Sequence, residues 1–237
     1  MAHTNNLRGE AVQDPVNVKD PVKEAILRQA ECQHALKFGE FTLKSGRKSP
    51  YFFNAADLNG GRVFEAIGRG YADVVSCCFG EEALGFDVIF GPAYKGILLA
   101  GIVSLGLYCF SGIDKPVSYN RKEQKDHGEG GSLIGATLKD KRVLIVDDVM
   151  TAGTAAEEAV EFIRAHGGVP VGMVTILDRQ EKAKDTEFSA VQQVEHRHCF
   201  PVKSILTFAD IRAYTRANQP QEIIQALEKY RTQYGVG

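Results

Sequence analysis

Hydrophobic residues near the start of the chain recur at helical spacing. Asp20 and Pro21 make a good helix start, with Asp as the N-cap and Pro at the first helical position. The apolar positions that follow are Val22, Ile26, Ala30 and Leu36. This pattern predicts a first helix that ends at Gly39.

A hairpin is the next expected unit. Two short extended segments, 41–44 and 51–54, flank a turn at Ser45 and Gly46. A second helix is expected over about 62–78. The residues before Pro21 are polar and lack the apolar core of a secretory signal, so segment 1–20 is expected to be a flexible extension.

After Gly85, short apolar runs alternate with helical patterns. The run 142–146 is aliphatic almost without interruption, as expected for a strand that is covered on both faces. The other expected strands are 86–90, 107–110, 117–119, 169–177 and 202–207, and the expected helices are 97–104, 155–166, 189–197 and 220–230. Strands separated by helices imply parallel β-α-β units, so the predicted fold class is α/β with a central sheet.

One segment has to be tested as a membrane span, because no residue from Gly96 to Ile113 is charged. The segment is interrupted by Gly96, Gly101, Gly106 and Gly112 and has no clean aromatic or basic flanks. A buried helix that leads into a buried strand fits this pattern better. We therefore expect no membrane association.

Composition is that of an ordinary soluble globular protein, with 237 residues of which 44% are hydrophobic and 24% charged. The formal net charge of −2 argues against a large basic surface for nucleic acid. The five cysteines are scattered and make a poor disulfide framework, which indicates a reducing, cytoplasmic location. Cys77 and Cys78 fall in an apolar helical stretch and are expected to be buried thiols.

The most informative motif is VLIVDDVMTAGTA, residues 143–155. It joins an aliphatic strand to two carboxylates, and then to a turn of small residues that opens a helix. Backbone N–H groups of the turn 151–154 can close around an anion, because helix N-termini and amide nests favour phosphate. Asp147 and Asp148 fall where the hydroxyls of a ligand, or a cation bound to it, would sit at the sheet edge. The P-loop and dinucleotide-binding spacings are absent.

This stretch resembles the phosphoribosyl-diphosphate (PRPP) signature of type I phosphoribosyltransferases. The resemblance implies that Asp147 and Asp148 meet the ribose hydroxyls and that the small turn holds the 5′-phosphate. The PRPP-binding residues that it implies here are Asp147, Asp148, Val149, Met150, Thr151, Ala152, Gly153, Thr154 and Ala155. A regulatory protein that only senses PRPP could keep the same motif.

A second motif, GPAYKG at 91–96, directly follows an expected strand. Its two glycines permit close backbone approach, and Lys95 brings a positive charge to the same sheet edge. Beside the PRPP motif it resembles the diphosphate-binding loop of the family, with Tyr94 and Lys95 as contacts.

The third motif, NRKEQKDHGEGG at 120–131, balances basic against acidic residues and is rich in glycine, as a mobile lid requires. A solvated loop of alternating charge is the simpler interpretation of the pattern alone. The block resembles the mobile catalytic loop of orotate phosphoribosyltransferases of the bacterial and fungal kind. That resemblance implies four catalytic, PRPP-binding residues that reach the diphosphate, partly across a homodimer interface: Arg121, Lys122, Lys125 and His127.

The last motifs are FTLKSGRKSPYFFN at 41–54 and DRQE at 178–181. Adjacent Phe52 and Phe53 would ordinarily be one core and one exposed residue of a strand, but near a lysine they can stack on a planar anionic ring. Arg179 follows a strand end and can pair bidentately with a carboxylate. The resemblance implies that Lys44 contacts PRPP. It also implies an orotate-binding set of Phe52, Phe53, Thr151 and Arg179.

The likeness runs from about Val22 to the C-terminus, with small departures at Leu98 and in loop 55–61. It implies a type I phosphoribosyltransferase fold, in which a central, mainly parallel sheet is flanked by helices and a small hood is built largely from the N-terminal region. The expected parts are an extension at 1–20, a region at 21–84 that contributes the hood, and a PRPP-binding core at 85–237 that carries the mobile loop.

The implied activity is transfer of the phosphoribosyl group of PRPP to orotate in pyrimidine biosynthesis, which gives orotidine 5′-monophosphate and diphosphate. Mg²⁺ is the implied cofactor, held mainly by substrate oxygens and water rather than by a protein cage. Two alternatives remain open, a phosphoribosyltransferase for a purine or uracil and a non-catalytic PRPP-binding regulator. The basic lid favours an enzyme, and Arg179 with the phenylalanine pair favours an anionic pyrimidine.

Overall fold

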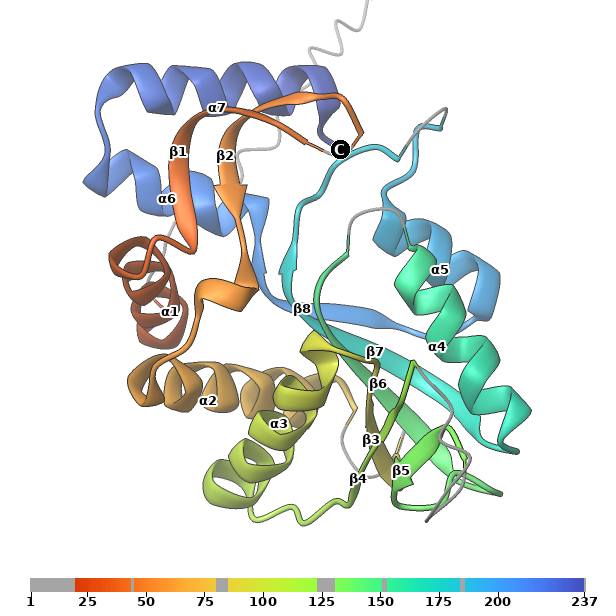
Figure 1. The fold of residues 1–237 in the computed structure, drawn as a ribbon. Helices are drawn as coiled ribbons and strands as arrows, with labels where there is room; N and C mark the ends of the chain where they lie inside the picture. Colours follow the sequence, from red (N-terminus) through yellow and green to blue (C-terminus); the bar gives the residue numbers. More distant parts are fainter. Residues whose placement is uncertain are drawn as a thin grey trace, which may run out of the picture.

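A six-stranded sheet forms the centre of the computed structural model, which describes residues 20–43, 45–79, 85–122, 131–150, 153–183 and 186–236. In spatial order its strands are β5 (Leu133–Gly135), β4 (Val117–Asn120), β3 (Val88–Gly91), β6 (Arg142–Met150), β7 (Val169–Asp178) and β8 (Val202–Thr207). All neighbouring strands are parallel except β4 and β5 (Figure 1). The predicted α/β class with a mainly parallel sheet is confirmed.

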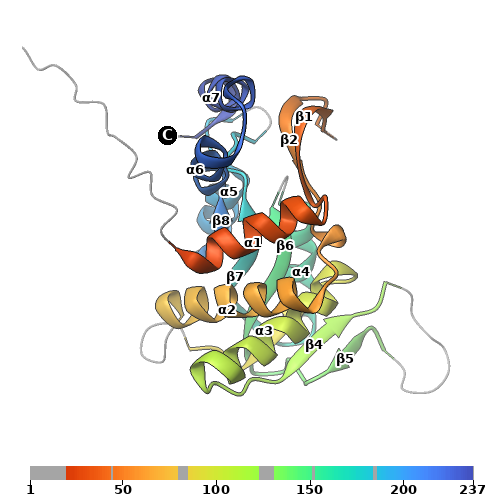
Figure 2. The ribbon, with the colours of Figure 1, turned by 90° about the vertical axis from the view of Figure 1, so that its left-hand side faces the viewer.

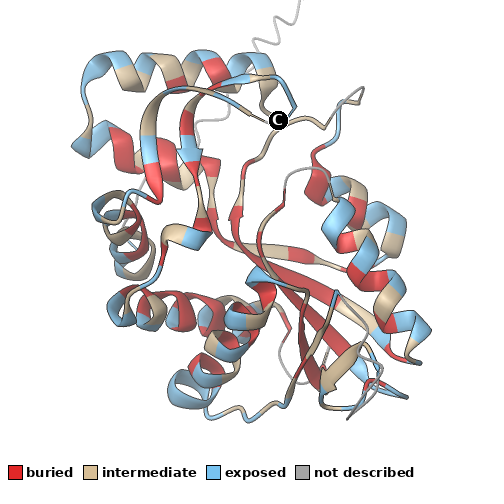
Figure 3. Ribbon diagram, in the orientation of Figure 1, coloured by how far each residue is buried: buried red, intermediate tan, exposed pale blue. Residues whose placement is uncertain are grey.

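Helices cover both faces of this sheet. Leu144 and Val146 of β6 belong to the core beneath α2 (Gly61–Cys78) and α3 (Lys95–Ser111). Val143 and Ile145 point the other way, toward α4 (Thr154–Ala165) and α5 (Ala190–His198). Each buried aliphatic side chain contributes about 1.5–3 kcal/mol, so the unbroken apolar run of β6 specifies a central strand. Figure 3 shows the buried residues on the sheet and on the inner sides of the helices.

A smaller unit stands at the carboxyl ends of the parallel strands (Figures 1 and 2). It contains the antiparallel hairpin of β1 (Leu36–Thr42) and β2 (Lys48–Phe53), together with α1 (Pro21–Cys32), α6 (Phe208–Asn218) and α7 (Gln221–Tyr234). Tyr51 of β2 stacks on Phe208 at 5.3 Å and meets the edge of Tyr230 at 6.4 Å between ring centroids. C-terminal helices therefore pack directly on the N-terminal hairpin.

The first helix ends earlier than its pattern predicts. It stops at Cys32, and Leu36 lies in β1 opposite Phe53. His34 has a left-handed backbone conformation with φ +57°, which breaks the helix between these points. Gly39 lies inside β1, where the register shifts between Phe38 and Phe41. Leu36 is apolar because it occupies an inward-facing strand position. Its agreement with the helical spacing is a coincidence.

The predicted strand at 107–110 is also wrong, because α3 is one helix over Lys95–Ser111. Gly106 interrupts the helical pattern in the sequence, but in the fold it lets α3 cross α2 closely. A Cβ atom at Gly106 would lie 2.3 Å from the carbonyl oxygen of Gly68. Within the described ranges, no helix has the length and apolar character needed to cross a membrane.

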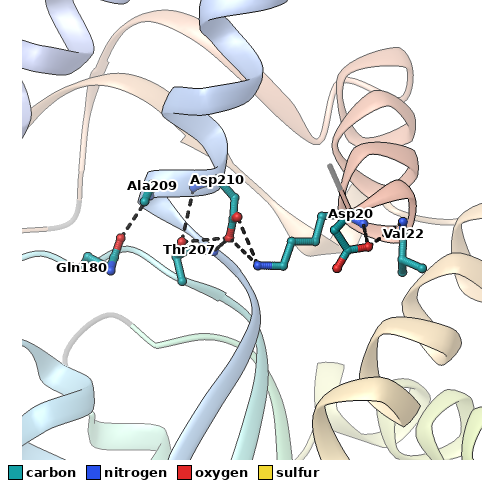
Figure 4. Close-up of polar contacts among 7 residues, drawn as sticks. Asp20, Val22, Gln180, Thr207, Ala209 and Asp210 are labelled. Carbon is teal, nitrogen blue, oxygen red and sulfur yellow. Dashed lines mark hydrogen bonds and ion pairs between the residues drawn. The ribbon is translucent and has the colours of Figure 1, made fainter. Parts of the chain in front are cut away.

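Two elements escape prediction, the short antiparallel strand β5 and the helix α6. The start of helix α6 does have a sequence signal, a capping box formed by Thr207 and Asp210. The side chain of each residue accepts a hydrogen bond from the backbone N–H of the other (Figure 4). Between Asn54 and α2, a 3-10 turn over Ala55–Asp57 is capped by the side chain of Asn54. Cys77 is exposed and Cys78 only half-buried, so the expectation of two buried thiols is wrong.

Candidate active site

The two adjacent carboxylates lie at the carboxyl end of β6. Lys95, the first residue of α3, places its Nζ 2.6 Å from Oδ2 of Asp148. The N–H of Asp148 donates to Oδ1 of Asp147 at 2.9 Å. Tyr71 of α2 is fully buried and donates its hydroxyl to the backbone oxygen of Asp147 at 2.9 Å. Two motifs thus meet at one sheet edge through residues that are 53 positions apart in the sequence.

These contacts give the two acids different environments. Burial, followed by the charge of Asp148, raises the pKa of Asp147 from 3.8 to about 6. Burial also raises the pKa of Tyr71 well above its ordinary value of 10.0, and the nearby aspartates add to this shift. Tyr71 therefore stays a neutral hydrogen-bond donor. With one ammonium against two carboxylates, the edge keeps an affinity for hydroxyl donors and cations.

The loop at 91–96 packs tightly under this edge. A Cβ atom at Gly91 would lie 2.0 Å from the carbonyl oxygen of Gly96, so neither position has room for a larger residue. The N–H of Ala93 donates to Oδ1 of Asn120 at 2.8 Å, which ties the loop to the end of β4. The peptide bond between Ala93 and Tyr94 is cis.

Residues 120–122, the described start of segment 120–131, lie beside this loop. Tyr94 is exposed, and Nζ of Lys122 lies 5.3 Å from the centroid of its ring. The N–H of Arg121 donates to the carbonyl oxygen of Ser132, which closes the base of segment 120–131. The contact between Lys122 and Tyr94 brings their sequence neighbours Arg121 and Lys95 to the same region.

On the other side of the carboxylates, the small turn leads into α4. Gly153 has a left-handed conformation with φ +78°, which glycine adopts without strain, and Thr154 and Ala155 begin the helix. Backbone N–H groups at the start of a helix favour anions such as phosphate. Met150 is buried in one hydrophobic core, and Val149 is partly buried against the other.

The structure separates the two phenylalanines that the sequence analysis groups together. Phe53 is 7% exposed and lies in the core, whereas Phe52 is 36% exposed and packs against Phe41 at 5.6 Å between ring centroids. Strand alternation puts neighbouring side chains on opposite faces of the hairpin. Only Phe52 has an exposed ring that can stack on a ligand.

Arg179 does pair with a carboxylate, but the carboxylate belongs to the protein. Its guanidinium is buried and contacts Oε1 of Glu181 through Nε at 2.8 Å and Nη2 at 2.7 Å. Arg179 follows Asp178, which pairs with Met150 in the sheet, so it lies one strand away from the PRPP motif.

Five of the predicted site residues lie outside the described residues: Lys44, Lys125, His127, Thr151 and Ala152. Sequence reasoning also misses four side chains that hold the site together, namely Ser49, Tyr71, Asn120 and Glu181. Tyr71 occupies an ordinary apolar position of a helical stripe, so nothing in the pattern distinguishes it. Glu181 and Asn120 stand inside motifs that the analysis singles out, and their polarity at a strand end is the signal that could have found them.

Known proteins resemble this chain over most of its length. A family model described as phosphoribosyl transferase domain matches residues 65–203. The orotate phosphoribosyltransferase of Stenotrophomonas maltophilia (strain K279a) is 49% identical over 218 residues, which cover 90% of this chain and 96% of the relative. The orotate phosphoribosyltransferase of Escherichia coli O139:H28 is 46% identical over 217 residues, with coverage of 91% and 99%.

Solved structures give the same result. The crystal structure of orotate phosphoribosyltransferase from Francisella tularensis superposes with a TM-score of 0.77 at 39% identity and covers 88% of this chain and 98% of its own. The enzyme from Mycobacterium tuberculosis in complex with PRPP shares the fold, with a TM-score of 0.60 at 22% identity over 81% and 99% of the two chains. This chain belongs to the phosphoribosyltransferase family, among the orotate phosphoribosyltransferases.

Proposed function

We propose that PRPP binds along the edge formed by the carboxyl ends of β3 and β6, where the family reaction takes place. The observation that carries this proposal is the contact between Lys95 and Asp148, which joins the 91–96 loop to the carboxylate motif. In this arrangement Asp147 and Asp148 accept hydrogen bonds from the ribose hydroxyls. The turn that ends at Gly153 binds the 5′-phosphate through its backbone, and Lys95 faces the diphosphate.

Breaking the anomeric C–O bond of PRPP develops positive character on the ribose and negative charge on the leaving diphosphate. The nitrogen of orotate is the nucleophile, so the reaction requires no covalent intermediate with the protein. Cationic side chains stabilise the leaving group where its charge grows. Lys95, Arg121 and Lys122 are the described candidates, and Lys125 and His127 of the lid are the proposed stabilisers or proton donors. Closure of the lid excludes water, which would otherwise hydrolyse PRPP.

Mg²⁺ fits the donor set at this edge. Two adjacent carboxylates face a single ammonium group, which leaves net negative charge for a hard cation that prefers oxygen ligands. In the described part of the chain, no group of three or more metal-ligating side chains comes together. Asp147 and Asp148 would hold the ion through water and substrate oxygens, and bound Mg²⁺ would neutralise charge on the diphosphate.

Orotate would enter between the hairpin and the end of β7. Arg179 supplies N–H groups for an anionic base on the hairpin face that carries Ser49 and Tyr51. Phe52 offers an exposed ring for stacking on the opposite face of the hairpin. Lys44 would approach from the hairpin turn and Thr151 from the PRPP motif. The carboxylate of orotate can accept hydrogen bonds from these N–H groups, and a neutral purine has no carboxylate to offer.

A homodimer is the proposed assembly, and the exposed face of α3 supports it. Leu98, Leu105 and Tyr108 are 54%, 64% and 62% exposed on this helix. Apolar residues at such spacing form one stripe that a second copy of the chain can cover. Free cysteines throughout the chain agree with a cytoplasmic enzyme.

The test is an assay of the purified protein with PRPP, Mg²⁺ and a panel of bases that contains orotate, uracil, adenine, hypoxanthine and guanine. Orotate should be consumed, with release of one diphosphate for each orotate, and the other bases should react far more slowly. Preference for a purine or uracil would contradict the proposed base pocket. PRPP binding without consumption of any base would identify a regulator instead.

A further inference from the structure

Arg179 is held by the protein from several sides at once. Two of its three guanidinium nitrogens, Nε and Nη2, bind the same oxygen of Glu181. Nη2 also donates to Oγ of Ser49 at 3.3 Å, and the guanidinium carbon lies 4.3 Å from the ring centroid of Tyr51. Both members of the ion pair are nearly enclosed, with side chains 8% and 12% exposed. The remaining nitrogen, Nη1, takes no part in these contacts. The hydroxyl of Tyr230 is a further neighbour of Arg179, which acts against the rise that burial gives to the pKa of Tyr230.

Gln180, which lies between Arg179 and Glu181 in the sequence, fixes the backbone of this turn. Gln180 has a left-handed conformation with φ +50°, and its N–H donates to the side chain of Asp178 at 2.8 Å. Its side-chain oxygen accepts the N–H of Ala209 at 3.0 Å, at the start of α6 (Figure 4). Its carbonyl accepts the N–H of Val236 at 3.0 Å. This turn points Gln180 toward α6 and leaves Arg179 and Glu181 free to face one another.

We propose that Glu181 is a positioning residue for recognition of the base, a role that rests on the proposed function of this site. Separating a buried ion pair leaves an uncompensated charge, so orotate should not displace Glu181 from Arg179. The pair instead stays formed and directs the N–H groups of Nη1 toward the ligand. Because Glu181 cancels the charge of Arg179, the pair selects a base by the direction of its hydrogen bonds more than by net attraction.

The test is steady-state kinetics of Glu181→Gln, which keeps the size of the side chain and removes its charge. We expect the KM for orotate to rise about tenfold or more, while the KM for PRPP and kcat change by less than about threefold. Glu187→Gln is the matched control, since Glu187 is an exposed partner of Lys182 in the same segment, and it should leave all three constants unchanged.

A double variant shows whether Glu181 acts through Arg179. If it does, Arg179→Ala combined with Glu181→Gln should be no worse toward orotate than Arg179→Ala alone. Additive losses, or an unchanged orotate KM in a folded Glu181→Gln protein, would overturn the proposal. If Glu181→Gln does not fold, Glu181→Asp keeps the charge with a shorter reach and should raise the orotate KM selectively, and equal rises for both substrates would overturn it. Failure of the wild type to use orotate would instead refute the proposed function.

Discussion

At the scale of single residues, the two carboxylates differ although they are neighbours. Asp148 is buried and faces Lys95, whereas Asp147 is half-buried beside another acid, and its pKa is raised to about 6. A raised pKa means that the folded protein disfavours ionised Asp147. Ionised Asp147 therefore lowers the stability of the folded protein most above about pH 6. This loss of stability declines as the pH falls toward 3.8 and is absent below that value.

Asp147→Asn should therefore stabilise the protein at neutral pH. We expect a gain of about 1–3 kcal/mol in the free energy of unfolding near pH 7.5, because Asn cannot ionise and its amide oxygen can still accept the N–H of Asp148. The gain should vanish by about pH 4. Chemical unfolding at a series of pH values measures this.

Asp148→Asn is the matched comparison, and it should lower stability near neutral pH because Lys95 loses its charged partner. A pH-independent effect of Asp147→Asn, or equal effects of the two substitutions, would contradict the different roles assigned to these carboxylates.

The sequence reveals the chemical groups of the site better than it reveals the side chains that hold those groups in place. The pair Asp147 and Asp148 and the cation Lys95 are recognisable because each stands at a strand end, in a motif of small residues. Tyr71 is not recognisable, since its hydroxyl binds a backbone atom far away in the sequence. The two phenylalanines show the converse error. Their residue type suggests that both rings stack on a ligand, but strand alternation buries Phe53 in the core.

At the scale of elements, the packing of α2 on α3 depends on two glycines. A Cβ atom at Gly106 would meet the carbonyl oxygen and carbon of Gly68 at 2.3 Å and 2.6 Å. Backbone atoms cannot move aside as a flexible side chain can. Since Lys95 is the first residue of α3, a shift of this helix would also disturb the contact with Asp148.

Gly106→Ala should therefore lower the free energy of unfolding by about 2–4 kcal/mol and reduce activity. Gly61→Ala, at the first residue of α2, is the control. Nothing lies within 4 Å of a Cβ atom there, and alanine favours helix over glycine by up to about 1 kcal/mol. Thermal unfolding of the two variants should move in opposite directions. Similar destabilisation by both would show that the crossing does not depend on Gly106.

Elements with strong patterns are predictable, whereas elements defined by tertiary contacts are not. The aliphatic run of β6 predicts a central strand because no other position buries both faces. In the sequence, segment 107–110 resembles a strand because Gly106 interrupts the helical pattern before it. In the fold, this glycine allows α3 to pack closely on α2. Leu36 shows the same ambiguity, since a single apolar residue fits either a helix or an inward strand position.

At the scale of the molecule, the ends of the chain combine to form one unit. The hairpin packs on α6 and α7, and the backbone of the last described residues bonds to the segment 180–182 beside Arg179. The family resemblance implies a hood built largely from the N-terminal region. Local sequence patterns do not reveal that α6 and α7 pack on the hairpin.

The proposed dimer places the lid of one subunit over its partner's site. A Lys125→Ala protein mixed with an Asp147→Asn/Asp148→Asn protein should regain activity, because each mixed dimer contains one intact combination. Leu105→Glu/Tyr108→Glu should lower the mass measured by light scattering to that of a monomer and abolish the regain. Demonstrably mixed dimers without any regain would argue against shared sites.

The most direct measurement compares the rate of orotate consumption by the wild type and by Asp147→Asn/Asp148→Asn, with PRPP and Mg²⁺ present and diphosphate release followed in parallel. The wild type should release one diphosphate for each orotate consumed, and the variant should be slower by about a hundredfold or more while it remains folded. A wild type that leaves orotate unchanged, or a variant that keeps the full rate, would contradict phosphoribosyl transfer at this sheet edge.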